Sequence, residues 1–64
     1  MNEGIKRLAE AIEESKRRFV ECSKLLGPGD FMTTAMRHEY EGLEKAFEIV
    51  TGERYFDYWM RTIN

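Results

Sequence analysis

The side chains that could carry chemistry are few in this chain and stand far apart. Cys22 is the only cysteine and His38 the only histidine of the 64 residues. Disulfides are therefore excluded as a source of stability, and a Cys/His zinc site lacks its ligands. A catalytic thiol would also need a neighbouring base and an oxyanion site, and the sequence shows neither. We expect no catalytic residue, no metal ion and no cofactor, with Cys22 on a core stripe and His38 at the surface.

Glu39 is the one acidic side chain that interrupts an apolar helix face. On a helical wheel it falls between Ala46 and Val50. A buried carboxylate is costly unless it is paired or hydrogen-bonded. Three side chains of the preceding segment would lie at its level in a helical hairpin and could reach it: Ser15, Lys16 and Arg18. We expect a buried pair that fixes the helix register or a dimer interface. The alternative is a carboxylate that faces a ligand or a partner.

The C-terminal segment combines aromatic rings with arginines. Tyr55, Tyr58 and Trp59 are interleaved with Arg54 and Arg61. Such a segment completes a core, or it recognises another protein, since aromatic and Arg side chains dominate interface hot spots. It would also suit a nucleotide-like ligand, whose base stacks on rings and whose phosphate binds guanidinium groups. The candidate partner- or ligand-binding residues are Arg37, Glu39, Arg54, Tyr55, Tyr58, Trp59 and Arg61.

Net charge and hydropathy limit the classes of function. The formal net charge is −2 and the pI is about 5.4, so a general nucleic-acid binder is disfavoured. The one basic run, 16–18, is surrounded by Glu13, Glu14 and Glu21 and is interpreted as a solvated helix face. We expect no membrane span and no signal peptide. Together with the unpaired cysteine, these features favour the cytoplasm.

Two breaks divide the chain into three predicted helices. The run Gly27-Pro28-Gly29-Asp30 holds the only proline, and Thr51-Gly52 forms the second break. Before the first break, apolar residues recur at steps of three and four, which is typical of a helix. Asp30 is a natural N-cap for the next helix. The predicted helices cover about 2–26, 31–51 and 54–63, with a loop at 27–30. We expect a single all-α domain, 1–64, in which an antiparallel hairpin carries a short aromatic-rich third helix.

The second predicted helix has a wider apolar arc than one neighbour can cover. One stripe is formed by Met32, Met36, Tyr40, Leu43, Phe47 and Val50. A second stripe beside it is formed by Ala35, Gly42, Ala46 and Ile49. Together they span about half the circumference. The third helix is too short to stand alone, so we expect it to dock near Ile5, Leu8, Leu43 and Phe47. Its own apolar face is formed by Phe56, Trp59, Met60 and Ile63.

A core built from so few residues is marginal, and this favours association with another copy of the chain. We expect a homodimer or higher homo-oligomer with a four-helix-like core. Its interface residues would be the small or apolar ones of the second stripe: Ala35, Gly42, Ala46 and Ile49. Small side chains there would let another helix approach closely.

These features favour a small non-enzymatic interaction protein that associates with itself. It would act by binding, or by inhibiting, a larger cytoplasmic partner. The alternative is an oligomeric binder or sequesterer of a small anionic, nucleotide-like ligand, held by aromatic and Arg side chains at a subunit interface. An enzyme ranks far below both, because no nucleophile–base pair, paired carboxylates or metal cluster is visible.

Overall fold

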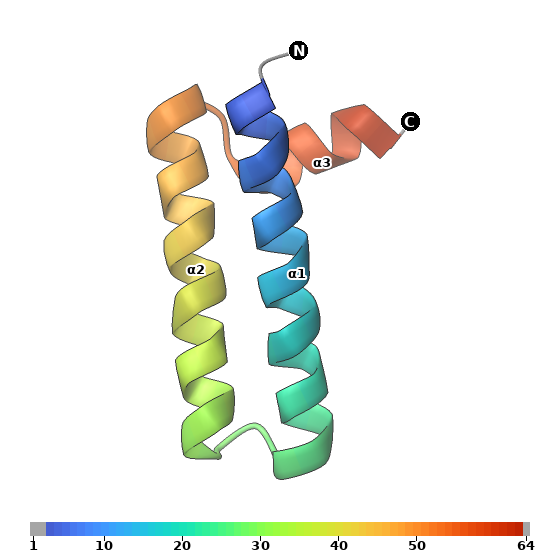
Figure 1. Cartoon of the computed structure of the whole chain (residues 1–64), viewed down its shortest axis with the longest axis vertical. Coiled ribbons are helices and arrows are strands. Elements are labelled where there is room, and N and C mark those ends of the chain that lie inside the picture. Colours follow the sequence, from blue (N-terminus) through green and yellow to red (C-terminus); the bar gives the residue numbers. More distant parts are fainter. Residues whose placement is uncertain (1–2, 64) are drawn as a thin grey trace.

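The computed structural model describes residues 3–63 and contains three helices (Figure 1). α1 spans Glu3–Leu26, α2 spans Phe31–Thr51 and α3 spans Tyr55–Ile63. α1 and α2 lie antiparallel, and α3 crosses the hairpin near its open end. The predicted all-α hairpin with a short third helix is confirmed. α3 begins one residue later than predicted, and position 2 lies outside the described residues.

Glycines in a left-handed conformation end the first two helices. Gly27 has a φ of 94° and Gly52 a φ of 76°, where a residue with a Cβ atom is strained. The amide of Gly52 donates to the carbonyl of Glu48 at 2.8 Å, which satisfies one carbonyl of the last turn. The Asp30 carboxylate accepts a hydrogen bond from the Met32 amide at 2.9 Å. The sequence signals for the start and end of α2 are therefore confirmed.

The apolar core lies at the open end of the hairpin. Among the described residues, the buried apolar side chains are Ile12, Phe47 and Tyr55. The Phe47 ring meets the Tyr55 ring edge-on with centroids 5.3 Å apart, and its centroid lies 5.0 Å from that of Tyr58. Partly buried side chains surround this group: Ile5, Leu8, Ala9, Tyr40, Leu43, Tyr58 and Trp59. The predicted docking place of the third helix is confirmed.

Toward the loop, the interface between α1 and α2 is more polar. Ser15 and Thr33 are both buried. The Ser15 hydroxyl donates to the carbonyl three residues earlier at 2.9 Å, and the Thr33 hydroxyl donates to that of Gly27 at 2.8 Å. Because both hydroxyls are hydrogen-bonded, their burial carries no large penalty. The rings of Phe19 and Tyr40 stack between the helices at 6.3 Å. This half of the hairpin therefore buries little apolar surface.

α3 docks through a different face from its most apolar one. Tyr55 and Tyr58 contact Phe47. The large apolar side chains on the neighbouring face are exposed by 59%, 42% and 57% in the order Phe56, Met60 and Ile63. Tyr55 is the buried residue of α3 because its ring packs against Phe47 while its hydroxyl reaches the Glu13 carboxylate of α1. Of the predicted apolar face of α3, only Trp59 is therefore packed against the core, and these three residues are not.

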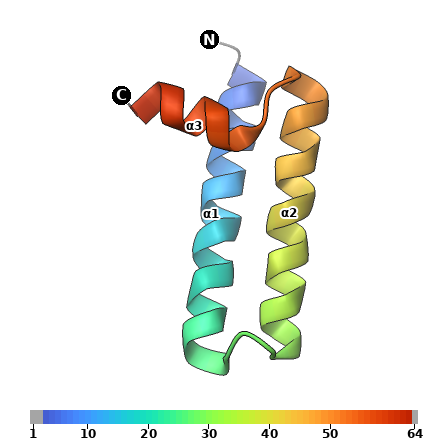
Figure 2. The ribbon, with the colours of Figure 1, turned by 180° about the vertical axis from the view of Figure 1, so that it is seen from behind.

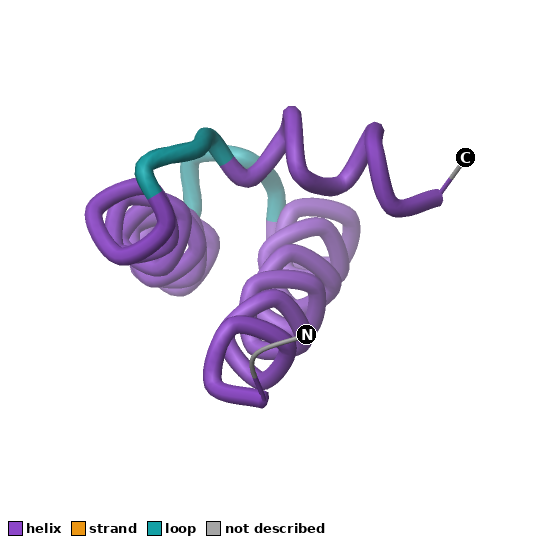
Figure 3. The backbone as a smooth tube through the Cα atoms, turned by 90° about the horizontal axis from the view of Figure 1, so that it is seen from above, coloured by secondary structure: helices purple, strands orange, loops and turns teal. Residues whose placement is uncertain are grey.

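The molecule is more open than a compact chain of its size. Its Cα radius of gyration is 12.6 Å, against roughly 10.7 Å expected for 64 residues. Its accessible surface is 4759 Å², against roughly 4,300 Å² for a compact monomer of 7.6 kDa. Figure 2 shows α3 in front of the hairpin, and Figure 3, viewed from above, shows that α3 lies on one side only. No described element covers the other side.

The position of the core predicts which phenylalanine the fold depends on. Phe47→Ala should cost about 3–5 kcal/mol, because it removes a fully buried ring and both of its aromatic contacts. That is most of the stability of a domain this small. Circular dichroism at 222 nm should show a largely unfolded chain at 25 °C. Phe56→Ala is the matched control and should remain helical, since the Phe56 ring is mostly exposed. Equal loss of helix in both variants would contradict this core.

Candidate functional site

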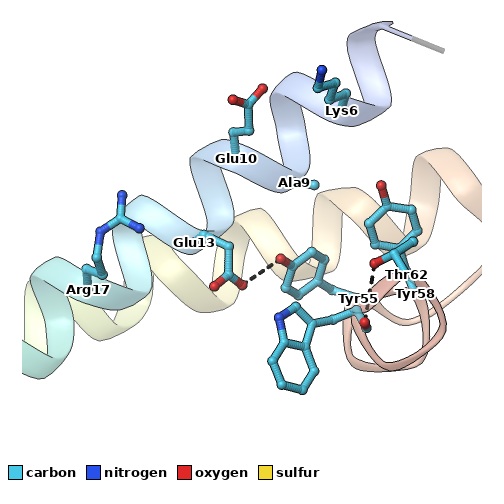
Figure 4. Close-up of a pocket in the computed structure, with 9 residues that line it drawn as sticks. Lys6, Ala9, Glu10, Glu13, Arg17, Tyr55, Tyr58 and Thr62 are labelled. Carbon is cyan, nitrogen blue, oxygen red and sulfur yellow. Dashed lines mark hydrogen bonds between the residues drawn. The ribbon is translucent and has the colours of Figure 1, made fainter. Parts of the chain in front are cut away.

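A shallow groove lies between α1 and α3, and it holds three of the predicted site residues (Figure 4). The α3 side of the groove is formed by Tyr55, Tyr58, Trp59 and Thr62, and the α1 side by Lys6, Ala9, Glu10, Glu13 and Arg17. The Tyr55 hydroxyl donates to the Glu13 carboxylate at 2.5 Å, across 42 positions of sequence. Burial, together with this hydrogen bond, raises the pKa of the Tyr55 phenol. Tyr55 therefore links α3 to α1 and is not free to bind a ligand through its hydroxyl.

Trp59 lies half-buried at the rim of this groove. The Lys16 ammonium sits 5.8 Å from the centroid of the Trp59 ring, a cation–π distance. The Phe56 ring stacks beside the Trp59 ring, with 6.4 Å between the two centroids. The groove walls carry two cations, Lys6 and Arg17, and two carboxylates. A groove with balanced charge does not select for an anion.

The structure does not bring the three predicted arginines together. Arg54 lies 3.2 Å from a carboxylate oxygen of Asp57, and Arg61 lies 2.7 Å from one of Glu53. The carboxylate of Glu53 raises the pKa of Arg61. Arg37 is exposed in the half of α2 next to the loop, whereas Arg54 directly precedes α3 and Arg61 lies within it. An anionic ligand would have to displace carboxylates from two of these side chains.

Glu39 is paired as predicted, but it is not buried. Its carboxylate lies 2.6 Å from Nη2 of Arg18, and the two side chains are 42% and 52% exposed. The expectation of burial is wrong because nothing in the described chain covers this part of α2. His38 is exposed, as expected, and lies 3.6 Å from a carboxylate oxygen of Glu41. Cys22 is half-buried.

Two apolar surfaces remain at the exterior. The first, called the α3 edge, consists of Phe56, Trp59, Met60 and Ile63. The second, called the open face, lies on the side of the hairpin that α3 leaves uncovered. Its α2 residues are Met32, Ala35, Glu39, Gly42, Ala46, Ile49 and Val50, and its α1 residues are Arg7, Glu14, Arg18 and Leu25. Sequence reasoning named Ala35, Gly42, Ala46 and Ile49. It did not name Leu25, which lies beside the apolar stripe of α1 and is exposed.

The place of the open face follows from helix geometry. On α2, α3 approaches the side formed by Glu41, Glu44 and Glu48. At 100° per residue, the row of Ala35, Gly42 and Ala46 points more than 100° away from that side. Ala35 and Ala46 are half-buried, and Gly42 is exposed. The row therefore forms part of the uncovered surface.

Within residues 3–63, no group of three or more His, Cys, Asp or Glu side chains is arranged to hold a metal ion. None of the helices in this range has the length and apolar character required to cross a membrane. The sequence matches no protein-family model, and no match is found among curated proteins or solved structures.

The Tyr55–Glu13 contact predicts how stability depends on alkaline pH. The pKa of Tyr55 is raised in the folded chain, and burial with a hydrogen bond to Glu44 raises that of Tyr40 to about 12. The protonated phenols thus favour folding below pH 10, and this contribution is lost as pH rises toward the folded values. Denaturant titrations should show the free energy of unfolding falling above pH 10.

The variant Tyr55→Phe tests how much of the alkaline loss of stability is due to Tyr55. It should cost about 1–2 kcal/mol at pH 7, because the hydroxyl bonded to a carboxylate is lost. The remaining fall above pH 10 should be smaller than in the parent chain, since only Tyr40 then contributes. A variant with unchanged stability at pH 7 and an unchanged alkaline profile would show that the Tyr55–Glu13 bond does not hold α3.

Proposed function

We propose that this chain is a small non-enzymatic interaction protein of the cytoplasm, which associates with itself and binds a larger protein partner. One observation carries this proposal. Within residues 3–63, ten large hydrophobic side chains are exposed by 40% or more, whereas three apolar side chains are buried. Exposed apolar residues that gather in patches mark interaction surfaces. The two patches of this chain are the α3 edge and the open face.

The α3 edge is the surface best suited to a protein partner. It places a tryptophan and a phenylalanine side by side, and aromatic side chains dominate interface hot spots. Its backbone is held in place through the neighbouring face, by the contacts of Tyr55 and Tyr58 with Phe47. A pre-positioned apolar surface loses less entropy on binding than a flexible one. The edge therefore supports recognition by an apolar groove of the partner.

A non-catalytic role is supported by how the polar side chains are used. Several of the described carboxylates bond other side chains of the same chain. Glu13 bonds Tyr55, Glu53 bonds Arg61, and Asp57 bonds Arg54. General acid–base catalysis needs a group within reach of a substrate and with a suitable pKa. These carboxylates are engaged in structural contacts instead.

The second candidate, a binder of a small anionic ligand, has less support. Its proposed arginines are separated or paired with carboxylates, and the groove beside the aromatic rings has balanced charge. A thermal-shift assay with nucleotides and with inorganic phosphate should therefore leave the melting temperature unchanged. A concentration-dependent rise would reverse the order of the two candidates.

Photo-crosslinking tests the α3 edge directly. With a photoreactive phenylalanine analogue at Phe56, we expect one discrete crosslinked product larger than twice the chain, formed in cells of the organism that encodes it. The same group at Asp57, the adjacent exposed position on another side of α3, is the matched control and should give no such product. The charge variant Phe56→Glu/Met60→Glu should compete poorly for the partner while remaining helical. Products that are only multiples of the chain itself, or equal products at both positions, would contradict a partner at this edge.

A further inference from the structure

The open face of the hairpin has the features of an interface with a second copy of this chain. In Figure 1 this face is turned to the viewer, with α3 behind it. Four of its large apolar side chains are strongly exposed: Leu25 by 75%, Met32 by 47%, Ile49 by 75% and Val50 by 66%. They surround the Arg18–Glu39 pair, which lies near the middle of the face. Arg7 and Glu14 are exposed on the same side of α1, so the apolar side chains of this face lie mainly along α2.

Gly42 gives an independent observation on the same face. It lies in the interior of α2, where glycine is less stable than alanine. A Cβ atom added there would meet nothing within 4 Å. Its φ also lies outside the left-handed region, so neither the fold nor the backbone of this chain requires glycine. A close approach by something outside the chain would explain it.

The charges of the open face indicate which partner could bind it. Arg18 and Glu39 lie side by side, with 2.6 Å between Nη2 and Oε1. A surface that holds an acid and a base at its centre is complementary to itself, because a twofold rotation brings each group opposite the other. We propose that the open face binds the open face of a second copy, about a twofold axis that passes beside this pair. Arg18 and Glu39 of the two copies then form one cluster of four alternating charges.

The size of the face suits such a dimer. Two adjacent helices, the longer of 24 residues, present a side of roughly 700 Å² in projection. A standard interface buries roughly 800 Å² on each partner. The small side chains of Ala35, Gly42 and Ala46 let the two backbones approach, and the exposed Leu, Met, Ile and Val side chains fill the space around them. The result is a four-helix core that the single hairpin lacks.

This inference rests on the self-association named in the proposed function, and it assigns the surface and the central contact. It does not involve the α3 edge, which lies on the other side of the hairpin (Figures 2 and 3). Variants of the open face should therefore leave the crosslink at Phe56 intact. Loss of the crosslink with an intact dimer would count against the partner at the α3 edge alone.

A pair of charge reversals tests the four-charge cluster. Sedimentation velocity at 5–500 µM, a range that spans about two decades, should show a dimer for the parent chain. Arg18→Glu and Glu39→Arg should each be monomeric over most of this range, because either homodimer would gather four like charges. When the two variants are mixed, each supplies the charges the other lacks. Native mass spectrometry should then show a heterodimer at least ten-fold more abundant than either homodimer.

The outcomes that overturn the proposal are equally distinct. A parent chain that stays monomeric at the highest concentration would exclude it. A dimer that persists in both charge variants would place the interface elsewhere. A mixture that forms no heterodimer would show that Arg18 and Glu39 contact each other only within one chain.

Gly42→Gln provides a second test that does not depend on charge. In a monomer the change should raise the melting temperature, because glutamine is a better helix former than glycine. In the proposed dimer its side chain enters the contact between backbones, and the dissociation constant should rise at least ten-fold. Glu41→Gln puts the same new side chain about 100° around α2, on the side that α3 approaches, and is the matched control. A Gly42→Gln chain that dimerises as tightly as the parent would overturn the proposed interface.

Discussion

The three helices of this chain meet at Phe47, whose ring contacts Tyr55 and Tyr58 of α3 and belongs to one buried cluster with Ile12 of α1. Phe47 is the one large side chain of α2 that is completely buried, and both of its ring partners come from α3. α3 has nine residues and would not remain helical in isolation. Its structure therefore depends on this contact and on the Tyr55–Glu13 hydrogen bond that continues it to α1. The loop half of the hairpin has no equivalent, since Ser15 and Thr33 take the buried places there.

The use of the tyrosines for docking determines what the surface of α3 presents. A helix of this length has about two and a half turns, so one side can dock while the other faces outward. Because Tyr55 and Tyr58 occupy the docked side, Phe56 and Ile63 are left at the exterior. The same contact holds α3 on one side of the hairpin and leaves the other side without cover. The α3 edge and the open face are thus both exposed because Tyr55 and Tyr58 pack against Phe47.

Much of the fold follows from local signals in the sequence. The breaks at Gly27 and Gly52 and the cap at Asp30 act within a few residues, so their effect is readable without the structure. The docked side of α3 is different, because it depends on Glu13, which is 42 positions from Tyr55 and looks like any other exposed acid of an amphipathic helix. The pairing of Glu39 with Arg18 follows from hairpin register. Its exposure does not, since the wheel shows an apolar arc but not what covers it.

The Arg18–Glu39 pair has a different meaning in one hairpin and in two. In a single hairpin both side chains are about half exposed, and such a pair contributes about 0–1 kcal/mol to stability. At the centre of a dimer the pair would lose water, and the cost of desolvation would offset much of the added attraction. Its contribution would then be to specificity: an acid and a base placed side by side reject any apolar surface that cannot match them. Affinity would come from the surrounding apolar side chains, and the choice of a second copy from the charges.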